Sequence, residues 1–300
     1  MTMLNALTVD VEDYFQVSAF ERYVDRSKWD DYPLRVEGNT RRVLELFDSF
    51  NVKGTFFILG WVAERCPLLV REIQERGHEI ACHGYGHELV YAIGPERFRA
   101  DVRRAKALLE DICGVKVCGY RAPSYSITAR SLWALDILIE EGFAFDSSVF
   151  PIHHDIYGLP GAPRFPHVIE RDSGSIKEFP LTTYPLRLGK KQYLLPIAGG
   201  GYLRLLPAEL LRTCVAAVNE KEEKPAVLYF HPWEIDPEQP RIRAGLKSTF
   251  RHYLNLHKTE GKLKHLLARL EFGTMSEVLS RCSSCDPCGA EAIAPVGENA

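Results

Sequence analysis

Two histidines of this 300-residue sequence, His83 and His87, have the spacing of a metal-binding pair. Imidazoles four residues apart lie on one face of a helical turn and can bind one metal ion together. Both follow the short run at residues 79–82, which we expect to be a strand, so the pair is predicted at the rim of a sheet. Taken alone, such a pair is more simply two exposed histidines in a loop.

Three acidic residues, Asp10, Glu12 and Asp13, follow the first predicted strand at residues 6–9. Acids at the end of an apolar strand are costly unless they are paired, solvated or bound to a cation. In an extended backbone Asp10 and Glu12 point the same way, whereas Asp13 points away. One acid could complete a His/His/carboxylate metal set that leaves a position for water, and the other could take the proton of that water. The alternative is a solvated turn.

Arg121 and His231 also follow apolar runs that read as strands. An arginine at a strand end can pair with a carboxylate and hold it ionised, although a structural salt bridge explains a single arginine equally well. An imidazole in this position can act as a general acid near neutral pH, and its alternative is a half-buried structural histidine. Together the four sites supply a metal, a base, a group that orients the base, and an acid. These are the parts of metal-assisted hydrolysis of an acyl compound.

The elements that must position these residues alternate along the chain between short strands and amphipathic helices. The strands are predicted at residues 6–9, 54–59, 79–82, 120–123 and 226–230, and the helices at residues 39–50, 67–76, 95–113, 128–141 and 207–220. This alternation predicts a mostly parallel α/β sheet of the (β/α) barrel type, with the reactive residues where strands end. We expect one domain over residues 1–280, with a loop-rich insertion at about 150–205.

The composition excludes several classes of protein. Lys and Arg number 37 against 40 Asp and Glu, a net charge of -3, so no broad basic surface for nucleic acid is expected. No transmembrane segment is evident, and the first residues lack the pattern of a signal peptide, which favours a cytoplasmic protein. A tail at residues 281–300 is expected to be disordered. Its Cys282, Cys285 and Cys288 could bind zinc or an iron–sulfur cluster, or could be free thiols.

The order of these motifs resembles the polysaccharide deacetylase family, with its NodB-homology domain (carbohydrate esterase family 4). An acidic motif, His-x-x-x-His, Arg-x-Pro, an Asp-containing motif and a His-Pro motif follow one another between residues 5 and 235. The stretches that begin at Thr8, Arg121, Asp146, Gly199 and His231 are similar to a narrower branch associated with bacterial exopolysaccharide loci of the exosortase type.

The resemblance implies a distorted (β/α) barrel that hydrolyses N-acetyl groups of amino sugars. By resemblance Asp10 is the general base, Arg121 orients it, and His231 protonates the departing amine. Asp146 would support His231, and His83 and His87 would bind the metal.

One departure from the family pattern concerns the metal. Val11 occupies the place of the usual metal-binding Asp and cannot coordinate, so Glu12 is predicted as the replacement and Asp13 as the fallback. Zinc fits two histidines and a carboxylate, and Co²⁺ or another divalent ion fits nearly as well. This departure also leaves open a metal-free enzyme.

The expected substrate is an N-acetylated amino-sugar glycan of an exopolysaccharide or its lipid-linked precursor. Tyr125, Tyr202 and Trp233 are predicted to stack on sugar rings, with ordinary core aromatics as the alternative. Two other functions stay open: a cyclic amide or imide hydrolase of the allantoinase type on the same scaffold, and an inactive carbohydrate-binding protein. Nothing in the sequence indicates the oligomeric state.

Overall fold

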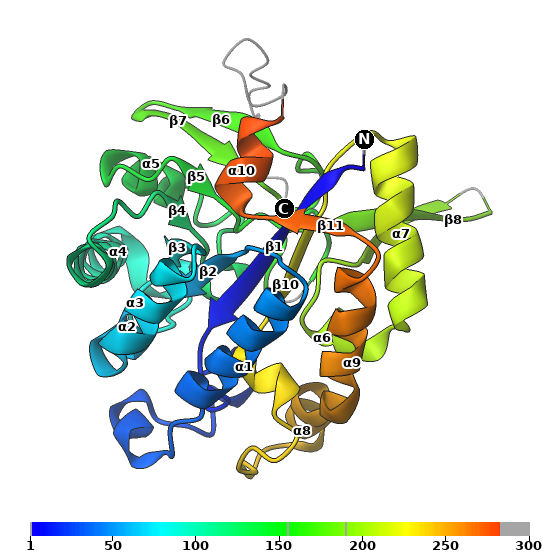
Figure 1. The fold of residues 1–300 in the computed structure, drawn as a ribbon. Coiled ribbons are helices and arrows are strands. Elements are labelled where there is room, and N and C mark those ends of the chain that lie inside the picture. Colours follow the sequence, from blue (N-terminus) through cyan, green and yellow to red (C-terminus); the bar gives the residue numbers. More distant parts are fainter. Residues whose placement is uncertain (1, 155, 190, 283–300) are drawn as a thin grey trace.

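The computed structural model of the chain describes residues 2–154, 156–189 and 191–282. Its centre is a curled, mostly parallel sheet with helices on its outer side (Figure 1). The strand order is β10-β1-β2-β3-β4-β5-β7-β6, and β11 pairs with the start of β1. The α/β fold class predicted from the alternation is therefore confirmed.

The described residues form the five predicted strands, with bounds that agree to within a few residues, and six further strands that were not predicted. The strands are β1 (Leu4–Val11), β2 (Thr55–Ile58), β3 (Glu79–Cys82), β4 (Gly119–Tyr120), β5 (Phe145–Asp146), β6 (His167–Arg171), β7 (Gly174–Glu178), β8 (Thr183–Leu188), β9 (Lys191–Pro196), β10 (Val227–Phe230) and β11 (Glu271–Gly273). β6 and β7 form an antiparallel hairpin on the main sheet, and β8 and β9 form a second hairpin. The region at 150–205 thus contains regular strands as well as loops.

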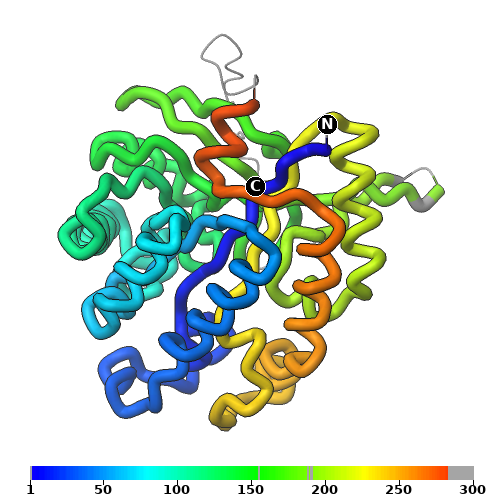
Figure 2. The backbone as a smooth tube through the Cα atoms, viewed as in Figure 1, coloured from blue at the N-terminus to red at the C-terminus, as the bar shows by residue number. Residues whose placement is uncertain are grey.

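The first strand lies in the middle of the molecule and ties together distant parts of the chain. Figure 2 shows β1 beside β10, with the segment of β11 crossing near its start, and the register pairs Val9 with Phe230. From Asn5 to Val11 the exposed fractions along β1 are close to zero, as expected for a parallel strand covered on both faces. Asp10 and His231 each come one residue later, so this register brings them to the same edge.

The helices cover the outer side of the sheet. They are α1 (Val36–Ser49), α2 (Gly60–Arg65), α3 (Pro67–Glu75), α4 (Val90–Cys113), α5 (Trp133–Glu140), α6 (Gly201–Leu205), α7 (Ala208–Lys221), α8 (Leu246–Tyr253), α9 (Leu256–Leu267) and α10 (Met275–Ser280). In α4 the buried Phe98, Val102, Ala105 and Leu109 recur at helical spacing, which is the pattern that predicts this helix. Among the described residues, no helix combines the length and the apolarity that crossing a membrane requires.

The side of the sheet between β7 and β10 is bridged by the chain that follows β7 and β9. The amide of Ile197 donates to the carbonyl of Thr182, and the amide of Gly200 donates to the carbonyl of Tyr229 on β10. Gly199 pairs with Tyr229 so closely that a Cβ at Gly199 would lie 1.7 Å from the Tyr229 carbonyl oxygen. The glycines at 199 and 200 therefore allow a backbone approach that closes the curled sheet beside β10.

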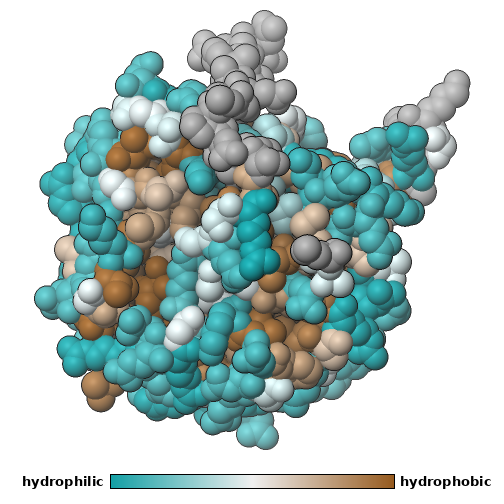
Figure 3. Space-filling view, turned by 45° about the horizontal axis from the view of Figure 1, so that its top comes forward, coloured by the Kyte–Doolittle hydropathy of each residue, from teal (hydrophilic) through white to brown (hydrophobic). Residues whose placement is uncertain are grey.

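Figure 3 brings the top of Figure 1 forward, and on this face hydrophilic residues dominate with hydrophobic patches between them. The reactive strand ends lie at the opposite end of β1, below in Figure 1. Of the predicted tail, residues 283–300, with Cys285 and Cys288, lie outside the described residues, and the extent of the domain over 1–280 stays a prediction.

Candidate active site

A cavity of about 180 Å³ lies at the carboxyl ends of the central strands. His83 follows β3 and His231 follows β10, as the sequence predicts, whereas Asp10 lies within β1, one residue before its end at Val11. The described residues that line it are Asp10, Glu12, Val17, Ser18, Ala19, His83, His87, Ser124, Tyr125, Tyr157, Arg204, Tyr229, His231, Trp233, Arg251 and His252. Residues from both ends of the chain thus meet in one place.

Arg121 lies beneath the cavity and is completely buried. Its guanidinium donates to Oδ1 of Asp10 at 2.7 Å, to the hydroxyl of Thr8 at 2.7 Å and to the hydroxyl of Ser147 at 2.9 Å. Burial acts to lower the pKa of Arg121, but the Asp10 carboxylate outweighs this effect and raises it. One oxygen of Asp10 is therefore held by a permanent cation, and the other, Oδ2, lies 3.4 Å from the Tyr125 hydroxyl.

The groups predicted as metal ligands converge on one point. One ligand atom each of Glu12, His83 and His87 lies within 4.8 Å of the others, and all three side chains are buried. Burial acts to raise the pKa of Glu12, but the imidazoles of His87 and His231 lower it to about 2, so this carboxylate is ionised. Burial lowers the pKa of His83 to about 4, so its imidazole is neutral at pH 7.

The donor atoms of this set are oriented for a cation. Nδ1 of His83 lies 2.7 Å from the carbonyl oxygen of Arg121, which only accepts, so Nδ1 carries the proton and Nε2 keeps its lone pair. Oε2 of Glu12 lies 2.8 Å from Nε2 of His87, yet among the described residues this buried oxygen accepts no hydrogen bond. A buried carboxylate oxygen without a hydrogen bond beside two imidazoles fits a divalent metal ion.

The loop that carries the two histidines is not the helical turn predicted from their spacing. Gly84 has φ +72° and His87 has φ +51°, so the backbone bends through the left-handed region between them. The Asp101 carboxylate fixes the loop by accepting from the amides of Tyr85, at 2.8 Å, and Gly86, at 3.3 Å. A side chain at Gly84 would meet Asp101 at 2.8 Å. The imidazoles converge because of this bend, with ring centroids 5.6 Å apart.

Asp13, the fallback ligand, has a different task. Its Oδ2 accepts from the amides of Arg35, at 2.7 Å, and Val36, at 2.9 Å, at the start of α1. It therefore caps the helix and binds free amides where the helix dipole favours a carboxylate. This leaves Glu12 as the carboxylate beside the histidines.

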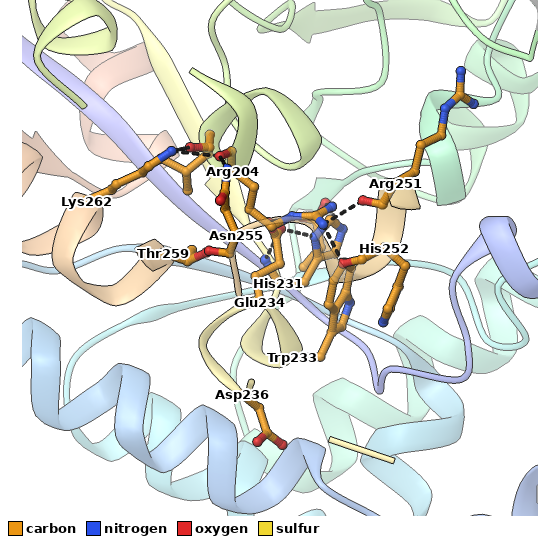
Figure 4. A network of polar contacts seen from close by, with 12 residues as sticks. Arg204, His231, Trp233, Glu234, Asp236, Arg251, His252, Asn255, Thr259 and Lys262 are labelled. Carbon is orange, nitrogen blue, oxygen red and sulfur yellow. Dashed lines mark hydrogen bonds and ion pairs between the residues drawn. The ribbon is translucent and has the colours of Figure 1, made fainter. Parts of the chain in front are cut away.

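The opposite side of the cavity is built around His231. Its Nδ1 lies 2.6 Å from Oε1 of Glu234, and Oε2 of the same carboxylate accepts from Nε of Arg204 at 2.7 Å. Figure 4 shows Arg204 between this carboxylate and the α8 backbone, where it donates to the carbonyls of Arg251, at 2.7 Å, and His252, at 2.5 Å. Burial acts to lower the pKa of His231, but the carboxylates of Glu12 and Glu234 raise it to about 9.

Asp146, predicted to support His231, lies elsewhere. It accepts from the Ser148 hydroxyl at 2.6 Å and lies near the Glu178 carboxyl, and both carboxyls are completely buried. Ser148 in turn accepts from the amide of Ala122, so this pair braces the Arg121 loop. The prediction is corrected because the carboxylate on His231 is that of Glu234, three residues further along the chain.

The three predicted stacking aromatics have three different positions. Tyr125 lines the cavity and places its hydroxyl near Asp10. Trp233 lies between the His231 ring, at 5.1 Å, and the His252 ring, at 4.1 Å, and both pairs are stacked. Its faces are therefore covered, which corrects the stacking prediction, and its Nε1 donates to Oε1 of Glu12 at 3.2 Å. Tyr202 lines a neighbouring cleft instead of this cavity.

Two residues of the site were missed in the sequence. Glu234 belongs to the stretch His-Pro-Trp-Glu, where a carboxylate three residues after a histidine can reach back in a tight turn, so a local signal was present. Arg204 lies in the short helix α6, and only the fold brings it to Glu234. Its sequence context carries no comparable signal.

The fold and the cavity define an α/β protein with a His/His/carboxylate site of the metal-binding type at its strand ends. Residues 27–138 match the family model "Polysaccharide deacetylase", and residues 147–280 match a domain of unknown function, DUF3473. The crystal structure of a Mycobacterium smegmatis protein assigned to the polysaccharide deacetylases covers 93% of this chain and 90% of its own, with a TM-score of 0.60 at 22% identity. This likeness supports the fold.

Two curated relatives match part of the sequence. A peptidoglycan deacetylase-like protein of Gibberella zeae is 33% identical over 120 residues, which are 39% of this chain and 35% of the relative. A peptidoglycan-N-acetylglucosamine deacetylase of Bacillus cereus is 31% identical over 98 residues, 32% of this chain and 36% of the relative. The matched region thus spans about a third of the length of either relative. The family model and both relatives thus make part of this chain similar to polysaccharide deacetylases.

Proposed function

We propose that this protein hydrolyses N-acetyl groups of amino sugars in an acetylated glycan. The observation that carries the proposal is the meeting of an arginine-held carboxylate, Asp10, with His231 and the Glu12/His83/His87 set around one cavity. Relatives named for peptidoglycan and chitooligosaccharide deacetylation support the class of substrate. An exopolysaccharide glycan or its lipid-linked precursor is the substrate we infer within that class.

Glu12, His83 and His87 would hold a divalent cation, for which we propose zinc. When bound, such an ion polarises the acyl oxygen and lowers the pKa of a coordinated water. Arg121 binds Oδ1 of Asp10, so Oδ2 is the atom that receives a proton as water attacks the acyl carbon.

His231 acts on the departing nitrogen. Its Nε2 faces the cavity 3.9 Å from Oδ2 of Asp10, while Glu234 binds Nδ1 and favours the protonated ring. Nε2 gives its proton to the nitrogen as the carbon–nitrogen bond breaks, which releases acetate and a free amine. Tyr125 borders the same space, with its hydroxyl 3.4 Å from Oδ2 of Asp10.

Acetate release from N-acetylated chitooligosaccharides and peptidoglycan fragments tests the proposal. The purified protein is assayed as isolated, after chelation, and after zinc is restored. We expect release that chelation removes and zinc recovers. Equal activity with and without chelator would contradict the metal role, and allantoin hydrolysis without acetate release would contradict the substrate class.

A further inference from the structure

A second cleft, of about 460 Å³, opens beside the reaction cavity. A molecule in one can extend into the other, because the two share the lining residues Ser18, Ala19, Ser124, Tyr157, Arg204, Tyr229 and Arg251. The far wall of the cleft is α8, together with α6 and the segment around Tyr157. A substrate whose N-acyl sugar reaches Asp10 would therefore place its next group in this cleft.

The wall on α8 is positively charged. Lys247 and Arg251 are four residues apart, so they lie on one face of the helix, and both line the cleft. Both are exposed, and within the described part of the chain neither side chain takes part in an ion pair. Figure 4 shows the Arg251 side chain extending away from the buried network that its carbonyl joins.

No opposite charge balances these cations within the cleft. None of its described lining residues is acidic, and the third cation, Arg204, is already paired with Glu234. Two like charges at helical i,i+4 spacing repel each other, and an anion between them removes that repulsion. The charge pattern therefore favours a ligand with a phosphate or another compact anion.

The cleft is also lined by apolar side chains that water reaches. Phe250 is 63% exposed and Leu205 is 54% exposed, and both border the cleft. Leu246, next to Lys247 at the start of α8, is 91% exposed. Apolar side chains gathered beside unpaired cations form a surface for an amphiphilic anion rather than for a neutral polysaccharide.

We propose that this cleft binds a lipid-linked phosphate on the substrate, with the phosphate at Lys247 and Arg251 and the apolar chain along Phe250 and Leu205. The inference rests on the proposed deacetylation, since it names the substrate class of the same site. The N-acyl sugar would occupy the reaction cavity, and its phosphate-linked chain would occupy the adjoining cleft.

Acetate release from three substrates tests the proposal: a neutral N-acetylated disaccharide, an N-acetylated sugar 1-phosphate, and its dodecyl phosphodiester. We expect kcat/KM to rise about tenfold with the phosphate and further with the dodecyl chain. The variant Lys247→Glu changes a residue that lines the cleft and not the reaction cavity, so it should lose much of both gains and keep the rate on the neutral disaccharide. Lys258→Glu, an exposed charge reversal on α9, is the matched control and should keep them.

Calorimetric binding of monomeric dodecyl phosphate keeps the test independent of turnover. Binding by the full chain that the double variant Lys247→Glu/Arg251→Glu loses supports the cleft, even if no sugar is deacetylated and the proposed function fails. Absence of binding overturns the inference. If inorganic phosphate binds equally well, the proposed contact of an apolar chain with Phe250 and Leu205 is wrong. If the protein binds only to anionic vesicles, the surface binds a membrane instead of a substrate.

Discussion

The two sides of the reaction cavity place histidines in opposite surroundings. On the side formed by the ends of β1 and β3, Nδ1 of His83 donates to a neutral backbone carbonyl, and burial lowers its pKa to about 4. On the side formed by β10, α6 and α8, Nδ1 of His231 meets the carboxylate of Glu234. Burial again acts to lower the pKa, but Glu12 and Glu234 raise that of His231 to about 9.

The difference teaches that the partner of Nδ1 decides what a buried imidazole can do. A carbonyl partner leaves a neutral ring with a free lone pair, as a metal ligand requires. A carboxylate partner stabilises the imidazolium, as a proton donor requires. The first side comes from strands in the region of the deacetylase family model and just before it, and the second from the region matched by DUF3473. We therefore expect variants on the two sides to fail in different ways.

Asp10 lies between the two sides, and its substitution should have the largest effect. Asp10→Asn keeps the shape and the contact with Arg121 but cannot receive a proton. We expect acetate release to fall about 10²- to 10⁴-fold, the usual contribution of a general base. Zinc content, measured by atomic absorption, should not change. Full activity in this variant would reject Asp10 as the base.

Glu234→Gln changes only the side of the cavity that contains His231. The amide no longer stabilises the imidazolium, so we expect kcat to fall about 10- to 100-fold with zinc affinity unchanged. Unfolding in urea should show a loss of about 1–3 kcal/mol, because Arg204 loses its charged partner.

The matched control for this variant is Glu209→Gln on α7. Glu209 also contacts an arginine and a histidine, Arg212 and His265, but its side chain is 60% exposed. Activity and stability should stay near those of the unchanged protein. A loss of activity in both variants would show that the effect of Glu234 is not specific to His231.

Trp233→Phe tests the metal-binding side of the cavity, because Trp233 contacts both His231 and Glu12. The phenyl ring still stacks between His231 and His252 but cannot donate to Glu12. We expect zinc affinity, measured against a chelating dye, to weaken about tenfold. Trp133→Phe on α5 is the control. An unchanged zinc affinity would mean that the indole N–H does not orient the carboxylate.

The smallest effect is expected beneath the site, at Glu178. Burial and the neighbouring Asp146 raise its pKa well above the usual range, and burial raises the pKa of Asp146 to about 6. A raised carboxyl pKa means that the folded state binds the proton, so its contribution to stability is complete below about pH 4 and is lost as pH rises through 6 and beyond. Glu178→Gln mimics the protonated form and should flatten this decline.

Urea unfolding between pH 5 and 9 measures the effect. The variant should match the unchanged protein at pH 5 and exceed it by about 1 kcal/mol at pH 9, the value of roughly one pKa unit. Glu170→Gln, an exposed carboxylate on the adjacent β6, should leave the slope unchanged. If the free energy of unfolding depends on pH in the same way in all three proteins, Glu178 does not have a raised pKa in the folded state.

The sequence alone predicts the strand ends well because apolar runs and the polar residues after them are local signals. Asp10, His83 and His231 are examples, and the register of β1 with β10 then brings two of them together. Contacts that depend on the fold are harder. The start of α1 is predicted near Asn39, whereas the helix begins at Val36, because Asp13, distant in sequence, supplies the cap.

Carboxylates near His231 show the same limit. The family resemblance assigns Asp146 to His231, although the carboxylate oxygen that lies 2.6 Å from Nδ1 of His231 belongs to Glu234. Spacing also misjudged the loop at His83 and His87, since four residues suit a helical turn and also suit a bend through Gly84. The sequence pattern thus predicts which residue types lie at the site, whereas the distances between side chains in the folded protein show which of them are in contact.

The glycine at 199 has a consequence for how precisely the acid is placed. Its α-carbon lies against the Tyr229 carbonyl, and Tyr229 is two residues before His231. Any larger residue at 199 would push β10 outward and shift the imidazole away from the acyl group, with no contact to the substrate itself. The position of the His231 imidazole thus depends on Gly199 having only a hydrogen atom in place of a side chain, in a segment that lies beside β10.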